Sequence, residues 1–111
     1  MLTLPIKKKW FDMILLGEKK EEYREIKPYY ETRFANDLTK RYPYSYECHL
    51  EAVNDIERQE YNIILRNGYS KNSPSIKCNI ELSKGYGKPE WGAEPGKEYY
   101  VLKILNVEEV K

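Results

Sequence analysis

The segment spanning residues 7–24 constrains the fold most, because the spacing of its side chains changes at a single glycine. Trp10 and Ile14 are four residues apart, and Phe11 and Leu15 repeat that spacing on the adjoining face, which predicts a short helix over residues 8–16. Glycine adopts the left-handed conformation that often ends a helix without a Cβ clash. We therefore expect the helix to end at Gly17 and to be enclosed by the rest of the fold.

The residues after this glycine have the spacing of a β-strand, which we predict over residues 20–26. Glu22 and Arg24 are two positions apart and share one face, while Tyr23 points to the other. A carboxylate–guanidinium pair between Glu22 and Arg24 would hold both side chains in fixed positions. The alternative is a solvent-exposed ion pair of little energetic value.

The remaining chain predicts mainly short strands. We expect them over residues 2–6, with Pro5 indicating an edge or a strand end, and over residues 61–66, 75–83 and 98–107. A helix is predicted over residues 29–38 and a second one where Leu50, Val53 and Ile56 recur every three residues. The Asn67-Gly68 dipeptide predicts a turn, and residues 85–96, rich in glycine and proline, predict an irregular loop.

These elements predict a single α+β domain over residues 1–111. The strands do not alternate regularly with helices, which argues against a doubly wound sheet. We expect a small, partly closed β-barrel of five or six mainly antiparallel strands, with two or three helices at one side.

The composition is that of an ordinary globular protein and does not by itself identify a partner. The net charge of +1 gives no global argument for a polyanionic partner. The 11 tyrosines are a clear bias, because tyrosine suits half-buried surfaces, stacks on bases and is enriched at protein interfaces.

Metal binding and membrane insertion are not expected. The two cysteines form no Cys-x-x-Cys pair, and the side chains of Cys48 and His49 diverge because they are adjacent, so we predict no metal site and no cofactor. Cys78 lies in a strictly alternating strand and is predicted to be a core residue. The chain has no signal-peptide pattern and no apolar run of membrane-spanning length, so we expect a cytoplasmic protein.

The sequence after the first helix also resembles a known family. Gly17, Lys19, Glu22 and Arg24 match the Gly-x-Lys-x-x-Glu-x-Arg signature of ASCH domains, which belong to the PUA-like superfamily. The Arg66-Asn67-Gly68-Tyr69 segment and residues 91–100 are also similar to small ASCH proteins of bacterial and phage type. The resemblance covers about two-thirds of the chain, does not include residues 42–60, and implies a PUA-like barrel.

The resemblance implies a cleft that faces RNA or a nucleotide-like ligand. Lys19 would meet a phosphate as a point charge, Arg24 would offer a planar fork, and Glu22 would orient Arg24 or accept from a base amino group. The predicted ligand-binding residues are Lys7, Trp10, Lys19, Glu22, Arg24, Arg66, Asn67, Tyr69 and Trp91.

Two other functions stay open at this point. Some ASCH relatives are amidohydrolases acting on acetylated cytidine, and ribonuclease activity is associated with the group, which would make Lys19 and Glu22 catalytic. Glu22 stands where the resembled amidohydrolase pattern has a threonine, and Glu81 is the candidate for its later carboxylate. The neighbouring carboxylates of Glu18 and Glu21 are expected to keep Lys19 charged, which favours binding over catalysis. The third hypothesis is a protein-interaction adaptor that uses the tyrosine-rich surface.

Overall fold

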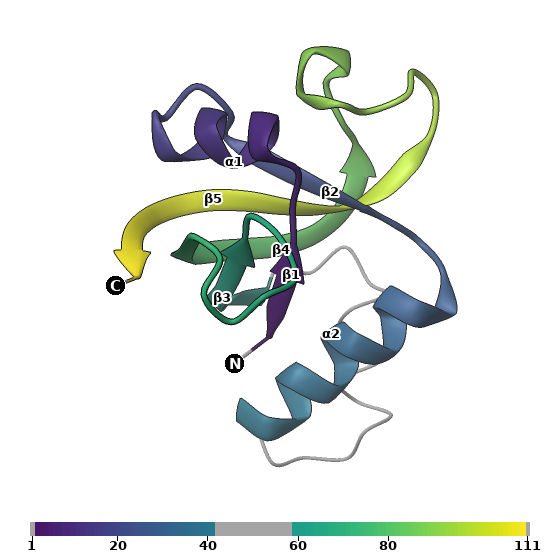
Figure 1. Ribbon diagram of the computed structural model, residues 1–111. Helices are drawn as coiled ribbons and strands as arrows, with labels where there is room; N and C mark the ends of the chain where they lie inside the picture. Colours follow the sequence, from purple (N-terminus) through teal and green to yellow (C-terminus); the bar gives the residue numbers. More distant parts are fainter. Residues whose placement is uncertain (1, 42–58, 111) are drawn as a thin grey trace.

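The computed structural model describes residues 2–41 and 59–110 (Figure 1). Its strands are β1 (Thr3–Pro5), β2 (Glu21–Glu25), β3 (Gln59–Arg66), β4 (Ser75–Tyr86) and β5 (Glu98–Val110). Its helices are α1 (Lys8–Leu15), α2 (Pro28–Arg41) and the short 3₁₀ helix η1 (Pro89–Trp91). Among these residues the strands form one sheet in the order β1-β3-β4-β5-β2, in which β1 runs parallel to β3 and the other neighbours are antiparallel.

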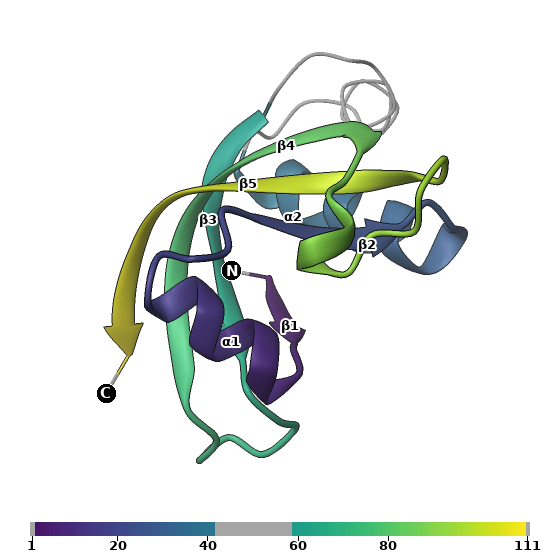
Figure 2. The same ribbon diagram turned by 90° about the horizontal axis from the view of Figure 1, so that it is seen from above.

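The sheet curls into a half-barrel, mostly through the long, bent strands β4 and β5 (Figures 1 and 2). The fold class is therefore α+β with a curled mixed sheet, which is compatible with the partly closed barrel expected from the sequence. Pro5 lies in β1, which is an edge strand, as predicted from its missing amide hydrogen.

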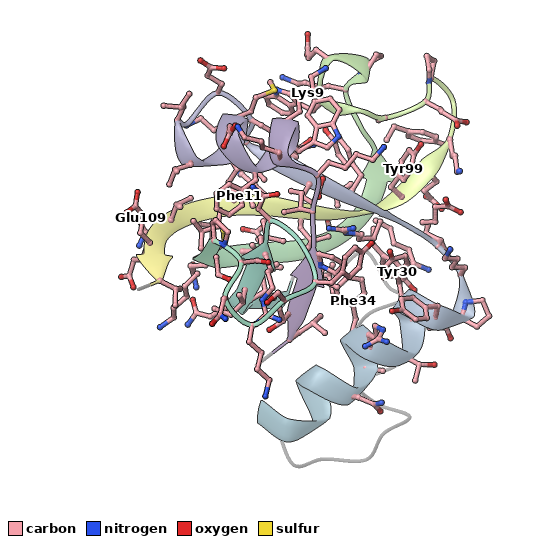
Figure 3. The ribbon with its side chains drawn as sticks, in the orientation of Figure 1. Lys9, Phe11, Tyr30, Phe34, Tyr99 and Glu109 are labelled. Atoms are coloured by element: carbon pink, nitrogen blue, oxygen red, sulfur yellow. The ribbon has the colours of Figure 1, made fainter. Side chains whose placement is uncertain are left out.

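One hydrophobic core fills the concave side of the sheet. Phe11 of α1 and Phe34 of α2 both point into it (Figure 3), so the two helices cover the same side. The alternating residues Ile76, Cys78 and Ile80 of β4 face this core and are fully buried. The prediction that Cys78 is a core residue is confirmed.

The segment over residues 85–96 differs from its prediction as an irregular loop. β4 continues through Gly85 to Tyr86, and these residues pair with Tyr99 and Glu98 of β5. The pairing with β5 supplies regular backbone hydrogen bonds, and tertiary pairing of this kind overrides the weak strand propensity of glycine. η1 then carries Trp91.

Several further predictions can be compared with the structure. Helix α2 contains the predicted residues 29–38 and begins at Pro28, a residue suited to the first helical turn. The predicted helix around Leu50, Val53 and Ile56 lies outside the described residues, as do Cys48 and His49. Within the described part of the chain, no helix is long and apolar enough to cross a membrane.

Candidate functional site

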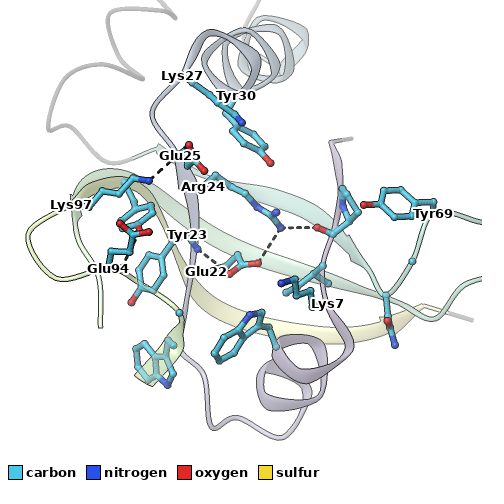
Figure 4. A pocket seen from close by; sticks show the side chains of 18 residues that line it. Lys7, Glu22, Tyr23, Arg24, Glu25, Lys27, Tyr30, Tyr69, Glu94 and Lys97 are labelled. Carbon is cyan, nitrogen blue, oxygen red and sulfur yellow. Dashed lines mark hydrogen bonds and ion pairs between the residues drawn. The ribbon is translucent and has the colours of Figure 1, made fainter. Parts of the chain in front are cut away.

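A pocket of about 700 Å³ opens where β2 meets α1, α2, η1 and the turn after β3 (Figure 4). We call it the motif pocket, because Glu22 and Arg24 lie at its centre. Its volume falls in the range of about 300–1,000 Å³ that is usual for small-molecule sites. Seven of the nine predicted ligand-binding residues line it: Lys7, Trp10, Glu22, Arg24, Asn67, Tyr69 and Trp91.

Lys19 is not among the lining residues of the motif pocket, because it lies buried behind them. Its side chain is 1% exposed, and its ammonium group donates a hydrogen bond to the carbonyl oxygen of Trp91. The same group lies 3.1 Å from Oε1 of Glu22 and 4.3 Å from the centre of the Trp10 ring. Lys19 thus joins the strand after α1 to the segment that carries η1.

Burial lowers the pKa of Lys19 below its usual value of 10.5. The carboxylate of Glu22 acts in the opposite direction, and Arg24 adds to the lowering. The sequence-based expectation considered only the neighbouring carboxylates, whereas burial has the larger effect on this pKa. Desolvation penalises the ammonium form more than the carboxylates stabilise it.

Glu22 uses both carboxylate oxygens within the protein. Oε1 lies beside Lys19 and also accepts a hydrogen bond of 3.0 Å from the backbone N–H of Tyr23, while Oε2 lies 3.0 Å from Nη2 of Arg24. The side chains of Glu22 and Arg24 are only 7% and 13% exposed. The alternative of a solvent-exposed ion pair is therefore wrong. The Glu22–Arg24 pair forms a fixed part of the pocket wall.

Arg24 lies at the centre of the motif pocket, where hydrogen bonds within the protein hold its guanidinium. Its Nη2 donates to Oε2 of Glu22 and, at 2.9 Å, to the carbonyl oxygen of Pro5. Its Nε is buried and has no hydrogen-bond partner among the described residues. Buried polar groups are nearly always hydrogen-bonded, so this Nε is an exception. Because Nε itself is covered by protein atoms, a ligand in the pocket would contact the exposed part of the guanidinium instead.

Aromatic side chains form much of the pocket wall. Sequence reasoning had selected Trp10, Tyr69 and Trp91, and Tyr69 is 89% exposed. It had missed Tyr30 at the start of α2 and Tyr99 at the start of β5. The excess of tyrosine was a signal for an aromatic surface, but it does not identify which rings converge.

Tyr23 lines the motif pocket although it points to the face of β2 opposite Glu22. Its ring packs with Ala93, Tyr99 and Val101 on that face, as the strand alternation predicted. Its hydroxyl donates to Glu21 and accepts a 3.0 Å hydrogen bond from the backbone N–H of Lys88. Because β2 is the edge strand of the sheet, a residue on either face can border the same opening.

Arg66 is the other predicted ligand-binding residue that does not line the motif pocket. It lies at the end of β3, where its carbonyl oxygen accepts a 2.8 Å hydrogen bond from the backbone N–H of Ile6. The turn that follows it does reach the pocket through Asn67, Gly68 and Tyr69. Gly68 has a φ of 121°, a conformation that other residues rarely adopt.

The lysines at the start of α1 are unfavourable for the helix dipole, and the structure shows what each contacts. Lys8 forms an ion pair with Asp12, and Lys9 lies 4.5 Å from the centre of the Trp10 ring. Lys7, the N-cap residue, is exposed and lines the motif pocket. The ammonium group of Lys7 therefore borders the motif pocket, whereas that of Lys8 pairs within α1.

The proposed catalytic carboxylate Glu81 does not line the motif pocket. It lies between the buried residues Ile80 and Leu82 of β4, so it points to the face of the sheet opposite the core. Among the described residues, no group of three or more His, Cys, Asp or Glu side chains could hold a metal ion.

Comparisons with known proteins add no identification. No protein-family model matches the chain, and no curated protein or solved structure matches it significantly. The resemblance to ASCH domains therefore stays a prediction from the motif residues.

Proposed function

We propose that this protein binds RNA or a nucleotide-like ligand through the motif pocket. The observation that carries the proposal is the guanidinium of Arg24, which Glu22 holds in place at the centre of an aromatic-lined pocket. Arginine held by a carboxylate is a preorganised partner for phosphate, because little side-chain freedom is lost on binding. The resemblance of Gly17, Lys19, Glu22 and Arg24 to the ASCH signature points in the same direction.

In this proposal Lys19 does not contact the ligand, and it positions Glu22 from the buried side of the pocket wall. It balances one side of the Glu22 carboxylate, and Arg24 balances the other at 3.0 Å. This chain of charges fixes Glu22, and Glu22 fixes Arg24. The ligand contacts then come from Arg24 and from the exposed side chain of Lys7.

The aromatic side chains would supply stacking surfaces for a base. Figure 4 shows Tyr30 and Tyr69 at the rim of the pocket, on two sides of Arg24. Stacking of a base on an aromatic ring contributes about 1–3 kcal/mol and tolerates different bases. Phosphate contacts and stacking together are the two components of most single-stranded nucleic-acid sites.

One observation favours the alternative of a nucleoside amidohydrolase. The lowered pKa of Lys19 is what a lysine general base requires. Access argues against this function, because Lys19 is 1% exposed and the pocket is lined by other residues. The binding function therefore accounts for the geometry better, and we expect no turnover of acetylated cytidine.

Binding can be measured by isothermal titration calorimetry with mononucleotides and with single-stranded RNA octamers. We expect dissociation constants in the micromolar range or weaker, equivalent to about −8 kcal/mol or less favourable. The Lys7→Gln variant should bind more weakly and show a shallower dependence on salt, because one phosphate contact is lost.

The matched control is Lys71→Gln, which removes an exposed charge that does not line the pocket. It should leave affinity within about twofold, because solvent screens an exposed charge that makes no contact with the ligand. Equal losses in the two variants would contradict a specific pocket. Turnover of acetylated cytidine that disappears in a folded Lys19 variant would support the enzyme instead.

A further inference from the structure

The motif pocket has two chemically different ends. Figure 4 shows Lys7 on one side of the Glu22–Arg24 pair, and Glu94 and Lys97 on the other. The first side offers cationic donors, whereas the second holds the carboxylates of Glu25 and Glu94 and the ammonium group of Lys97 among aromatic rings. A ligand that spans the pocket should therefore have a strongly anionic end and an end that donates hydrogen bonds.

The cationic end matches the charge of a single phosphate. The Glu22 carboxylate neutralises only one of the cations Lys19 and Arg24, and Lys7 adds a further charge. When Lys19 is protonated, this end carries two net positive charges, close to the −1.5 to −2 of a phosphate monoester at neutral pH. The pocket as a whole has four lining cations against three lining carboxylates, which is too little excess charge for several phosphates.

The opposite end is suited to a flat ring with a hydrogen-bond donor. Tyr23 and Tyr99 have ring centres 5.7 Å apart and meet at a tilt of 42°, and both line the pocket. Glu25 lies 3.9 Å from Lys97, which compensates its charge. No such ion pair to Glu94 is found among the described residues, so its carboxylate remains available to accept hydrogen bonds from a ligand.

We infer that the motif pocket takes one nucleoside monophosphate unit with an amino-bearing base, with its phosphate at Lys7 and Arg24 and its amino group at Glu94. This inference rests on the proposed nucleotide-binding function and specifies its ligand. A carboxylate accepts hydrogen bonds from the exocyclic amino group of cytosine or adenine. Uracil has a carbonyl oxygen in the place of the cytosine amino group, and that oxygen would face the carboxylate unfavourably.

Calorimetric titration with CMP and UMP isolates the amino group, because the two ligands have the same phosphate, sugar and ring size. We expect CMP to bind at least about tenfold more tightly than UMP, because UMP lacks one hydrogen bond to a charged group. Cytidine, which lacks the phosphate, should bind more weakly than CMP.

Two pairs of variants separate the ends of the pocket. Glu94→Gln should bring the CMP/UMP affinity ratio close to one, whereas Glu90→Gln, an exposed carboxylate in the same segment that does not line the pocket, should leave it unchanged. Lys7→Gln should weaken both ligands equally and preserve their ratio, and Lys71→Gln should change neither.

RNA octamers of cytidine and of uridine distinguish a free nucleotide from a nucleotide within RNA. Preference for the cytidine octamer, with CMP competing for it, would assign the same pocket to one nucleotide of an RNA chain. Equal binding of CMP and UMP that weakens in Lys7→Gln would overturn the inference and leave the proposed function standing. Octamer binding without mononucleotide binding would overturn the single-nucleotide unit, and no binding of any of these ligands would overturn both proposals.

Discussion

The ammonium nitrogen of Lys19 lies 3.1 Å from Oε1 of Glu22, in a position where both side chains are almost fully removed from solvent. A buried ion pair is costly to assemble, because both charges lose their hydration, but breaking it is also costly once the fold exists. The pair therefore couples the stability of the protein to the geometry of the motif pocket.

The first prediction concerns the stability contribution of Lys19. Lys19→Met should lower the free energy of unfolding by about 3 kcal/mol, because Glu22 would lose one of its charge partners while remaining buried. Urea denaturation followed by fluorescence measures this loss. The size of this effect follows from the burial of Lys19, whose side chain is only 1% exposed.

The neighbouring Lys20 provides the matched control, because its side chain is exposed. Lys20→Met should change the free energy of unfolding by less than about 0.5 kcal/mol. The double variant with Lys19→Met and Glu22→Gln should be less destabilised than the sum of its single changes. Each single change leaves one buried charge of this pair without its partner, whereas the double change removes both charges. Strict additivity would show that the two residues do not interact energetically.

The second prediction concerns Gly87, which contacts the ring of Tyr23. A Cβ atom at Gly87 would lie 2.5 Å from the Tyr23 ring and 2.7 Å from Cβ of Ala93. Gly87→Ala should therefore destabilise the protein by about 1–3 kcal/mol, as overpacking usually does, and should also weaken ligand binding by displacing the pocket wall.

Gly85→Ala is the control for this substitution, because its Cβ would meet only Cγ2 of Val101 at 3.9 Å, an ordinary contact. Thermal unfolding and CMP titration of both variants provide the comparison. If Gly87→Ala were as stable as Gly85→Ala, the tight packing of Tyr23 against Gly87 would be wrong.

The third prediction is a loss of stability in alkaline solution. Burial raises the pKa of the Cys78 thiol from 9.0 to about 12, raises that of Tyr100 from 10.0 to about 12, and also raises the pKa of Tyr23. In the pH range between each unfolded and folded pKa, the folded protein binds more protons than the unfolded chain. Stability must then fall as pH rises, by up to about 1.4 kcal/mol per pH unit for each group.

Lys19 contributes with the opposite sign, because its pKa is lowered in the folded protein and the unfolded chain binds more protons. Its contribution increases stability as pH approaches 10.5. Cys78, Tyr100 and Tyr23 together outweigh this contribution of Lys19, so we expect the free energy of unfolding to decrease above about pH 9–10. Urea denaturation between pH 7 and 11 measures this change. In the Cys78→Ala variant, the free energy of unfolding should decrease less above pH 9 than in the unmodified protein. An unchanged slope in that variant would contradict the burial of the thiol.

Local sequence patterns were sufficient for the elements that surround the motif. Helical spacing before Gly17 and strand spacing after it predicted α1 and β2, and Gly17 has a φ of 79°. Alternation along β4 predicted the burial of Cys78. These predictions succeeded because they depend on which side chains share a face, and that property follows from backbone geometry over a few residues.

Local patterns were insufficient for the environment of each charge. The sequence places carboxylates beside Lys19, and this predicted a charged lysine without indicating that it is buried. In the folded protein its hydrogen-bond acceptor is Trp91, 72 residues later in the chain, and the ring of Trp10 covers it from α1. The convergence of Tyr30, Glu94 and Tyr99 on one pocket depends in the same way on the curvature of the sheet.

Local spacing along the chain was thus enough to predict the first helix, its end at Gly17, the strand after it and the shared face of Glu22 and Arg24 on β2. The burial of Lys19 behind this pair and the position of Arg24 at the centre of the motif pocket depend on the packing of distant segments. Desolvation depends on every atom around a charge, and the atoms around Lys19 include the carbonyl group of Trp91, which local sequence patterns cannot place beside it.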